Sequence, residues 1–310
     1  MKIRLLALCA SLAPLVLAAA PALVRADDAP ATHQVALRTR WKAGEVVTVT
    51  SKEQFVQNVV KVVDGKPVEA TEPGFGKKET NTDYVAIVKC VEADADGYAT
   101  KQLVHFVKFE RKEGEKANTS LQGLPVRIDG KLAARTVTVV TPEKKLDDET
   151  VQWLDKNFGK QQRVDKFLAT LEPKDPQAVG ASWKVGGQEL ADAMDDGTVP
   201  LEPSKMGAGV TLKGVEGDHA GYEIEVVVAL KGLPVGGGQV LPWKDGGKGK
   251  VTLKFARGLA ADGAESAVES DNEMDGIVAT PEAEIHLAFK GHEMTTIEKG
   301  GEMPEVAPAK

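Results

Sequence analysis

Cysteine is nearly absent from this 310-residue chain, which contains only Cys9 and Cys90. Cys9 lies in an N-terminal segment that we expect to be removed, so the mature chain would form no internal disulfide. Cys90 alternates with Tyr84, Ala86 and Val88, and this period of two predicts a buried position on a strand. The pattern is compatible with a free thiol and with a disulfide to another chain.

Long apolar runs are also absent after the first residues, so no transmembrane segment is expected in the mature chain. At the start, Lys2 and Arg4 precede apolar residues 5–23, and Val24-Arg25-Ala26 gives small residues at the positions that a signal peptidase reads. This arrangement is typical of a cleaved signal peptide. We therefore expect residues 1–26 to direct export to the periplasm or the cell exterior.

Basic residues are fewer than acidic ones, 39 against 46, which gives a formal net charge of −7. Loss of Lys2, Arg4 and Arg25 with the signal peptide would leave 36 basic residues and a net charge of −10. An acidic surface repels phosphate backbones, so no nucleic-acid partner is expected. Aromatic residues make up only 5% of the chain, so its core must be built largely from aliphatic side chains.

The pattern Lys-x-Val-Glu-x-Asp-x-x-Gly-Tyr occurs twice, at residues 89–98 and 213–222. Each copy predicts a strand, an acidic turn and a second strand, because alternating apolar residues flank a group of turn formers. A Trp-Lys-x-Gly marker precedes each copy, at Trp41 and Trp183, and we expect both tryptophans to be core anchors. The matches indicate an internal duplication of one β unit.

The fold class expected from the sequence is mainly β. Alternating apolar and polar residues predict two related curved antiparallel sheet units, half-barrel-like, which form either one sheet or two. A Gly/Pro-rich stretch at residues 233–249 has the composition of a loop. The main strands are expected at residues 45–63, 80–91, 98–112, 207–215, 222–230, 265–274, 284–290 and 293–299.

The segment between the two units has the spacing of a helix. Asp147 is a candidate N-cap, and two apolar stripes that are out of phase across Gly159 predict two short helices or one kinked helix. The expected organisation is therefore a signal peptide, two β units that flank a helical segment, and a flexible tail. Their bounds are residues 1–26, 27–140, 141–176, 177–300 and 301–310.

Three short motifs carry a resemblance to a known group of proteins. They are Trp-Lys-x-Gly-Glu at residues 41–45, Val-Gly-Ala-Ser-Trp at residues 179–183 and the closing run at residues 284–299. Together they resemble a family of exported bacterial β-proteins of unknown function that is common in planctomycetes. The resemblance implies export and a curved antiparallel sheet, and it implies no catalytic residues.

Residues 271–282 have the spacing of a calcium-binding EF-hand loop. Asp271, Glu273, Asp275 and Glu282 offer oxygen ligands at loop positions one, three, five and twelve. The flanking residues alternate like strands, however, so the sequence favours an acidic hairpin over a Ca²⁺ site.

The histidines make no recognisable metal-binding motif. His286 is expected to face solvent and His292 to lie in the turn that follows. A zinc site built from these two residues would need ligands from elsewhere in the chain.

Motifs of nucleophilic catalysis and phosphate binding are missing. Residues 180–184 lack the last glycine of a nucleophile elbow, and residues 246–250 lack the residues of a phosphate loop.

We therefore expect a non-enzymatic exported binding or scaffold protein whose concave sheet face holds an apolar small molecule or a peptide. One alternative is a hydrolase of envelope polymers with dispersed carboxylates, which requires two acids close together, one of them desolvated. Another is a calcium-linked adhesion module at residues 271–282.

Overall fold

A computed structural model describes twelve segments of the chain, which are residues 31–37, 40–69, 75–130, 136–140, 146–154, 157–158, 161–194, 200–216, 219–235, 239–244, 248–258 and 266–304. The expected signal peptide, Gly159 at the expected helix break, and residues 217–218 of the second repeat copy lie outside the described residues.

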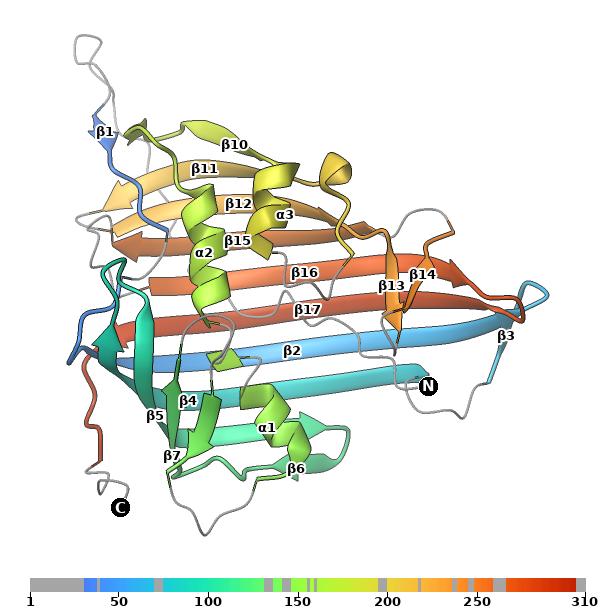
Figure 1. Ribbon diagram of the computed structural model, residues 1–310, viewed down its shortest axis with the longest axis horizontal. Coiled ribbons are helices and arrows are strands. Elements are labelled where there is room, and N and C mark those ends of the chain that lie inside the picture. The colour runs from blue at the N-terminus through green and yellow to red at the C-terminus, as the bar shows by residue number, and fades with distance from the viewer. Residues whose placement is uncertain are drawn as a thin grey trace.

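One antiparallel sheet of 13 strands dominates the structure (Figure 1). Its main path runs in the order β10-β11-β12-β15-β16-β17-β2-β4-β5-β7-β8, with β3 paired to β2 and β6 paired to β5. This confirms the expected mainly β, antiparallel fold. The strands of this sheet are β2 (Val46–Val63), β3 (Lys66–Val68), β4 (Gly76–Ala93), β5 (Ala99–Glu113), β6 (Lys116–Asn118), β7 (Pro125–Asp129), β8 (Thr136–Val139), β10 (Ser182–Gly186), β11 (Gly207–Glu216), β12 (His219–Ala229), β15 (Lys248–Gly258), β16 (Ser266–Ala279) and β17 (Glu284–Lys299).

The pairing of β17 with β2 joins the two halves of the chain into one sheet. Its register runs without a shift from Glu284 opposite Val62 to Lys299 opposite Val47. The last strand of the second half therefore lies beside the first long strand of the first half. Of the two arrangements that the sequence allowed, one sheet or two, the structure has the single sheet.

Both copies of the repeated pattern form antiparallel hairpins, β4–β5 and β11–β12. Their turns differ, because Ala93 pairs with Ala99 across residues 94–98, whereas Glu216 pairs with His219. Tyr98 consequently lies in a turn, while Tyr222 lies in the ladder opposite Leu212. The two hairpins share their direction and pairing but not their register, and the duplication itself stays a prediction.

The helices cover one face of the sheet, which we call the inner face (Figure 1). Two of them, α1 (Asp148–Leu154) and α2 (Gln161–Leu171), lie where the sequence predicted helical structure. A third, α3 (Gly187–Met194), was not predicted, because its apolar stripe is short and follows a pair of glycines. Gly187 is required there, since a Cβ atom would lie 2.0 Å from the Pro203 carbonyl oxygen.

Asp147 is the N-cap of α1, as predicted. Its Oδ1 accepts a hydrogen bond of 2.7 Å from the Thr150 N–H, and this bond is the main reason that the pKa of the Asp147 carboxyl is lowered.

We expect Asp147→Ala to lower the free energy of unfolding by about 0.5–2 kcal/mol and Asp147→Asn to lower it less. A lowered folded-state pKa means that this stabilisation is present above the unfolded pKa and is lost as the pH falls through the folded pKa. Urea unfolding of both variants at neutral and acid pH measures the effect. An alanine variant as stable as the original chain at neutral pH would contradict it.

Two stretches differ from the expected pattern. The expected loop at residues 233–249 contains the hairpin of β13 (Gly232–Val235) and β14 (Gln239–Pro242), and β15 begins at Lys248. The two expected strands at residues 284–290 and 293–299 form the single strand β17, so His292 lies in a strand and not in a turn. A small separate sheet pairs β1 (Thr32–His33) with β9 (Gln177–Ala178).

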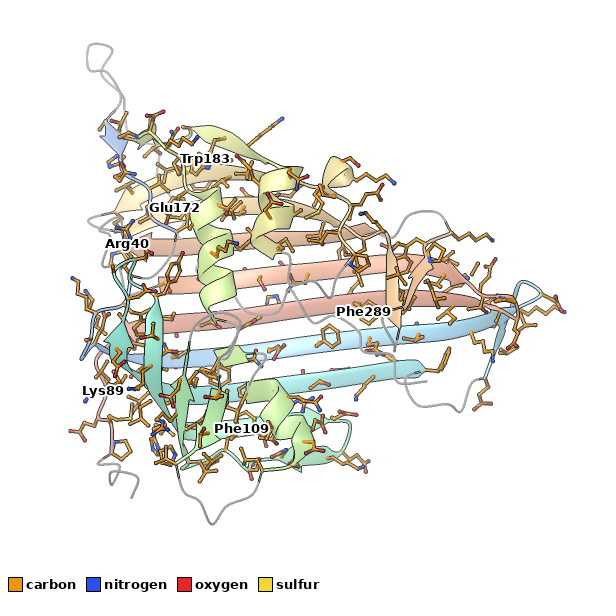
Figure 2. All side chains as sticks on the ribbon, viewed as in Figure 1. Arg40, Lys89, Phe109, Glu172, Trp183 and Phe289 are labelled. Atoms are coloured by element: carbon orange, nitrogen blue, oxygen red, sulfur yellow. The ribbon has the colours of Figure 1, made fainter. Side chains whose placement is uncertain are left out.

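Two apolar clusters pack against the inner face, and Phe289 and Phe109 mark them in Figure 2. The larger cluster joins β10–β12 and β16–β17 to α2, α3 and the β13–β14 hairpin. The smaller one joins β4, β5 and β7 to α1. Tyr222 and Ile224 of β12 are buried on this face, while Glu223 between them points to the other face, which we call the outer face.

No helix among the described residues has both the length and the apolar character needed to cross a membrane.

Candidate functional site

A row of polar side chains crosses the inner face between the two apolar clusters. Thr82 lies opposite Glu53, Glu53 opposite Glu293, and Glu293 opposite Ser270 on four neighbouring strands. We call these four residues the central polar row. Thr82, Glu293 and Ser270 are each at most 3% exposed, and Glu53 is partly exposed. Burying a polar group costs free energy unless the group is hydrogen-bonded. We therefore ask which groups stabilise the buried members of this row.

Neighbouring hydroxyls stabilise the Glu293 carboxylate. The Ser51 hydroxyl donates to Glu293 Oε1 over 3.1 Å, and the Thr295 hydroxyl lies 2.9 Å from the same oxygen. Ser51 and Thr295 are themselves opposite each other on β2 and β17, two residues from the central polar row. The pairing of β2 with β17, which joins the two halves of the chain, therefore brings both hydroxyls to the Glu293 carboxylate.

The negative charges of Glu293 and Glu53 also affect the hydroxyl of Tyr84. Burial, followed by the negative charge of Glu293 and more weakly that of Glu53, raises its pKa above the usual range. Tyr84 also contacts the α1 side of the smaller cluster, where its ring centroid is 5.5 Å from that of Trp153.

Tyr84 gives a pH prediction. Because its folded-state pKa is raised, its contribution to stability is complete below the unfolded pKa of about 10 and is lost as the pH rises above that value. We expect the free energy of unfolding to fall more steeply above pH 10 in the original chain than in Tyr84→Phe, by up to about 1.4 kcal/mol per pH unit. Urea unfolding at a series of alkaline pH values tests this, and equal slopes in the two proteins would refute it.

An apolar surface adjoins the central polar row on the inner face. Phe55 and Phe289 stack with their ring centroids 6.0 Å apart and their planes at 21°, and Met274 lies opposite Phe289. Phe289 is buried, whereas Phe55 and Met274 are half-buried. We call these three residues the apolar shelf. Gly291 lies beside the Phe55 ring, and a Cβ atom there would lie 3.6 Å from Phe55 Cδ2, which is an ordinary contact distance.

The residues with the spacing of an EF-hand loop lie along β16 and beyond it. Asp271, Glu273 and Asp275 are exposed alternate residues of this extended strand on the outer face, and Glu282 lies in the turn before β17. Alternate residues of a strand are about 7 Å apart, so the three carboxylates form a line and do not surround a point. The segment is thus an acidic hairpin, which is the alternative that the sequence favoured.

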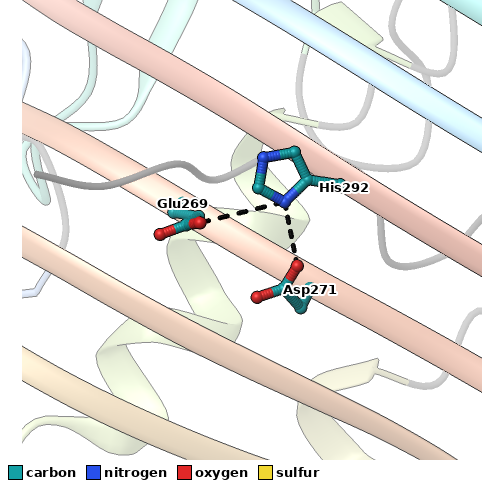
Figure 3. Close-up of side chains that lie close together, drawn as sticks. All are labelled: Glu269, Asp271 and His292. Atoms are coloured by element: carbon teal, nitrogen blue, oxygen red, sulfur yellow. Dashed lines mark hydrogen bonds and ion pairs between the residues drawn. The ribbon is translucent and has the colours of Figure 1, made fainter.

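A different group of side chains meets on the outer face (Figure 3). His292 Nδ1 lies 2.8 Å from Asp271 Oδ1 and 3.9 Å from Glu269 Oε1. The sequence did not show this group, because Glu269 precedes the EF-hand spacing and His292 reaches Asp271 only through the pairing of β16 with β17. His286 contacts Glu284 instead, over 3.3 Å, and lies six residues from His292 along the same strand, so the two histidines do not share a site.

Three further predictions about single residues concern Cys90, Trp41 and Trp183. Cys90 is completely buried, as predicted, and its Sγ lies 3.4 Å from the Glu92 carbonyl oxygen. Trp41 is buried in the smaller cluster, and the partly buried Trp183 packs against the larger one. The Trp183 indole donates a hydrogen bond of 2.8 Å to the Leu171 carbonyl, which ties β10 to the end of α2.

Comparisons with known proteins give little further information. No family of proteins matches the chain, and no curated protein matches it. A structure from work on lipid–protein interactions in lipovitellin is similar, with a TM-score of 0.38 and 8% identity over 86% of this chain, which spans 27% of that one. A structure from work on the asymmetric conductivity of engineered proteins has a TM-score of 0.16 and 9% identity over 83% of this chain and 100% of that one. TM-scores this low support no conclusion about function.

Proposed function

We propose that the protein is an exported binding protein without catalytic activity, and that its inner sheet face holds the apolar part of a small molecule or peptide. The observation that supports this function is the apolar shelf. Its Phe55 and Met274 side chains are only partly buried, whereas Leu287 and Val278 on the same face of β17 and β16 are buried. Covering such a surface is favourable by about 25 cal/mol for each Å² of apolar area removed from water.

The central polar row suggests what the other end of the ligand is like. Glu53 is two residues from Phe55 on β2, and alternate residues of a strand point to the same face. A ligand whose apolar part covers Phe55 and that extends about 7 Å along β2 would therefore bring its other end beside the Glu53 carboxylate. An amphipathic molecule with a neutral polar or cationic end fits this arrangement better than a wholly apolar one.

A fluorescent apolar probe, N-phenyl-1-naphthylamine, tests the site in vitro. We expect its fluorescence to rise on binding to the purified mature protein and to rise less in Phe55→Ser. Val56→Ser is the matched control, because Val56 is the next residue of β2 and points to the outer face. If folded Phe55→Ser and Val56→Ser bound the probe equally well, the apolar shelf would not be the binding site.

One specific observation bears on the alternative of an envelope-polymer hydrolase. Glu53 and Glu293 are directly opposite each other, so their Cβ atoms are about 4.5–5.5 Å apart, and one of the two acids is desolvated. Two neighbouring acids, one of them desolvated, are what the hydrolase alternative requires of its catalytic pair. However, Glu293 is only 2% exposed, and a polymer cannot reach it in this conformation. Release of soluble fragments from peptidoglycan by the original chain but not by Glu293→Gln would favour the hydrolase over the binding protein.

A further inference from the structure

Three side chains of types that can ligate a metal ion converge on the outer face, on the side of the sheet opposite the apolar shelf. We propose that Glu269, Asp271 and His292 form a binding site for a first-row divalent ion such as Zn²⁺. One atom from each side chain, a carboxylate oxygen or an imidazole nitrogen, lies within 4.8 Å of the other two. This is a different ligand set from the EF-hand spacing, with which it shares Asp271 alone.

The distances between the donor atoms suit one small ion. Zn²⁺ binds nitrogen and oxygen ligands at about 2.0–2.2 Å in a tetrahedron, so two of its ligand atoms are about 3.4 Å apart. The two distances from His292 Nδ1, 2.8 Å to Asp271 and 3.9 Å to Glu269, lie on either side of that value. The His292 nitrogen is therefore close to the separation from each carboxylate that one ion needs.

The backbone that carries the three residues is fixed by the sheet. Glu269 and Asp271 are alternate residues of β16, and the buried Ser270 between them points to the inner face. His292 lies directly opposite Asp271 on β17, in a ladder without a register shift. Because both strands are internal to the sheet, the donors are placed by two continuous ladders and not by a loop.

The exposure of the three side chains determines how the ion would be bound. Their exposed fractions are 23% for Glu269, 53% for Asp271 and 40% for His292, so one side of the group is open to solvent. Three protein ligands would therefore leave a fourth position for water or for a ligand from another molecule. The mixture of one imidazole and two carboxylates favours Zn²⁺ over Ca²⁺, since Ca²⁺ takes six to eight oxygen ligands.

Calorimetric titration of the purified mature protein with Zn²⁺ tests the site. We expect one binding event, and we expect His292→Ala and Glu269→Gln each to weaken it at least about tenfold, because each removes one of three ligands. His286→Ala and Glu273→Gln are the matched controls. They make the same changes on the same strands and the same outer face, outside the group, and should leave the affinity unchanged.

Circular dichroism of each variant shows whether it is folded, so that a loss of binding can be assigned to the ligand. As an independent measurement, Co²⁺ added to the original chain should give visible absorption bands that are absent in His292→Ala. The proposal is overturned if Zn²⁺ gives no heat, or if the ligand variants bind it as tightly as their controls. The apolar shelf plays no part in this test, so the result says nothing about the proposed binding of an apolar ligand, which the fluorescent probe tests separately.

Discussion

Phe106→Ala is expected to lower the free energy of unfolding by about 3–5 kcal/mol, because it removes a large buried ring and leaves a cavity. Phe106 is completely buried at the centre of the smaller cluster. Its ring centroid lies 5.5 Å from that of Phe158 and 5.7 Å from that of Phe109, both in edge-to-face arrangements. Urea unfolding followed by tryptophan fluorescence measures the change, since Trp153 belongs to the same cluster.

Val107→Ala is the control for this variant. Val107 is the next residue of β5, lies at the register shift where it pairs with no residue of β4, and is 49% exposed, so its truncation should change stability by no more than about 0.5 kcal/mol. If the two variants lost similar amounts of stability, the position of the smaller cluster on the inner face would be wrong.

Ala288→Pro is the second variant with a large expected effect. Ala288 is exposed on the outer face of β17, where it pairs with Asn58 of β2 and Asp275 of β16. Proline has no N–H group and cannot sit in an internal strand without breaking a ladder hydrogen bond. We expect a loss of about 2–4 kcal/mol, because one carbonyl acceptor loses its partner and the strand must bend.

Ala288→Pro should also destabilise the two halves of the chain together. β17 and β2 hold the two halves together, so Trp153 in the smaller cluster and Trp243 in the larger one should report a single shared transition, shifted to lower urea. Ala288→Thr keeps the N–H group and should leave the midpoint nearly unchanged. Separate transitions for the two tryptophans in the original chain would mean that the halves fold independently.

Local features of the fold could be predicted from the sequence because their causes are local. Alternating residues along β12 place Tyr222 and Ile224 on one face of the strand, and the sequence around Asp147 predicts a helix cap. The pairing of β17 with β2 has no such local signal. Ser51 and Glu293, which hydrogen-bond across it, are 242 residues apart in the chain.

The candidate sites were harder to predict for the same reason. Asp271, Glu273 and Asp275 are spaced by two residues, which is the spacing of both an EF-hand loop and one face of a strand. The strand places them in a line, and the group that meets at Asp271 is completed by His292 from the neighbouring strand. Likewise, the central polar row consists of single residues from four strands, and only the register of the sheet brings them together.

Native mass spectrometry of residues 27–310, purified without detergent, tests the proposed binding function most directly. We predict a population heavier than the polypeptide by the mass of a small amphipathic molecule, which is lost after extraction with organic solvent and is reduced in Phe55→Ser but not in Val56→Ser. A single species with the mass of the polypeptide alone, from a folded protein that also fails to bind the apolar probe, would contradict the proposal.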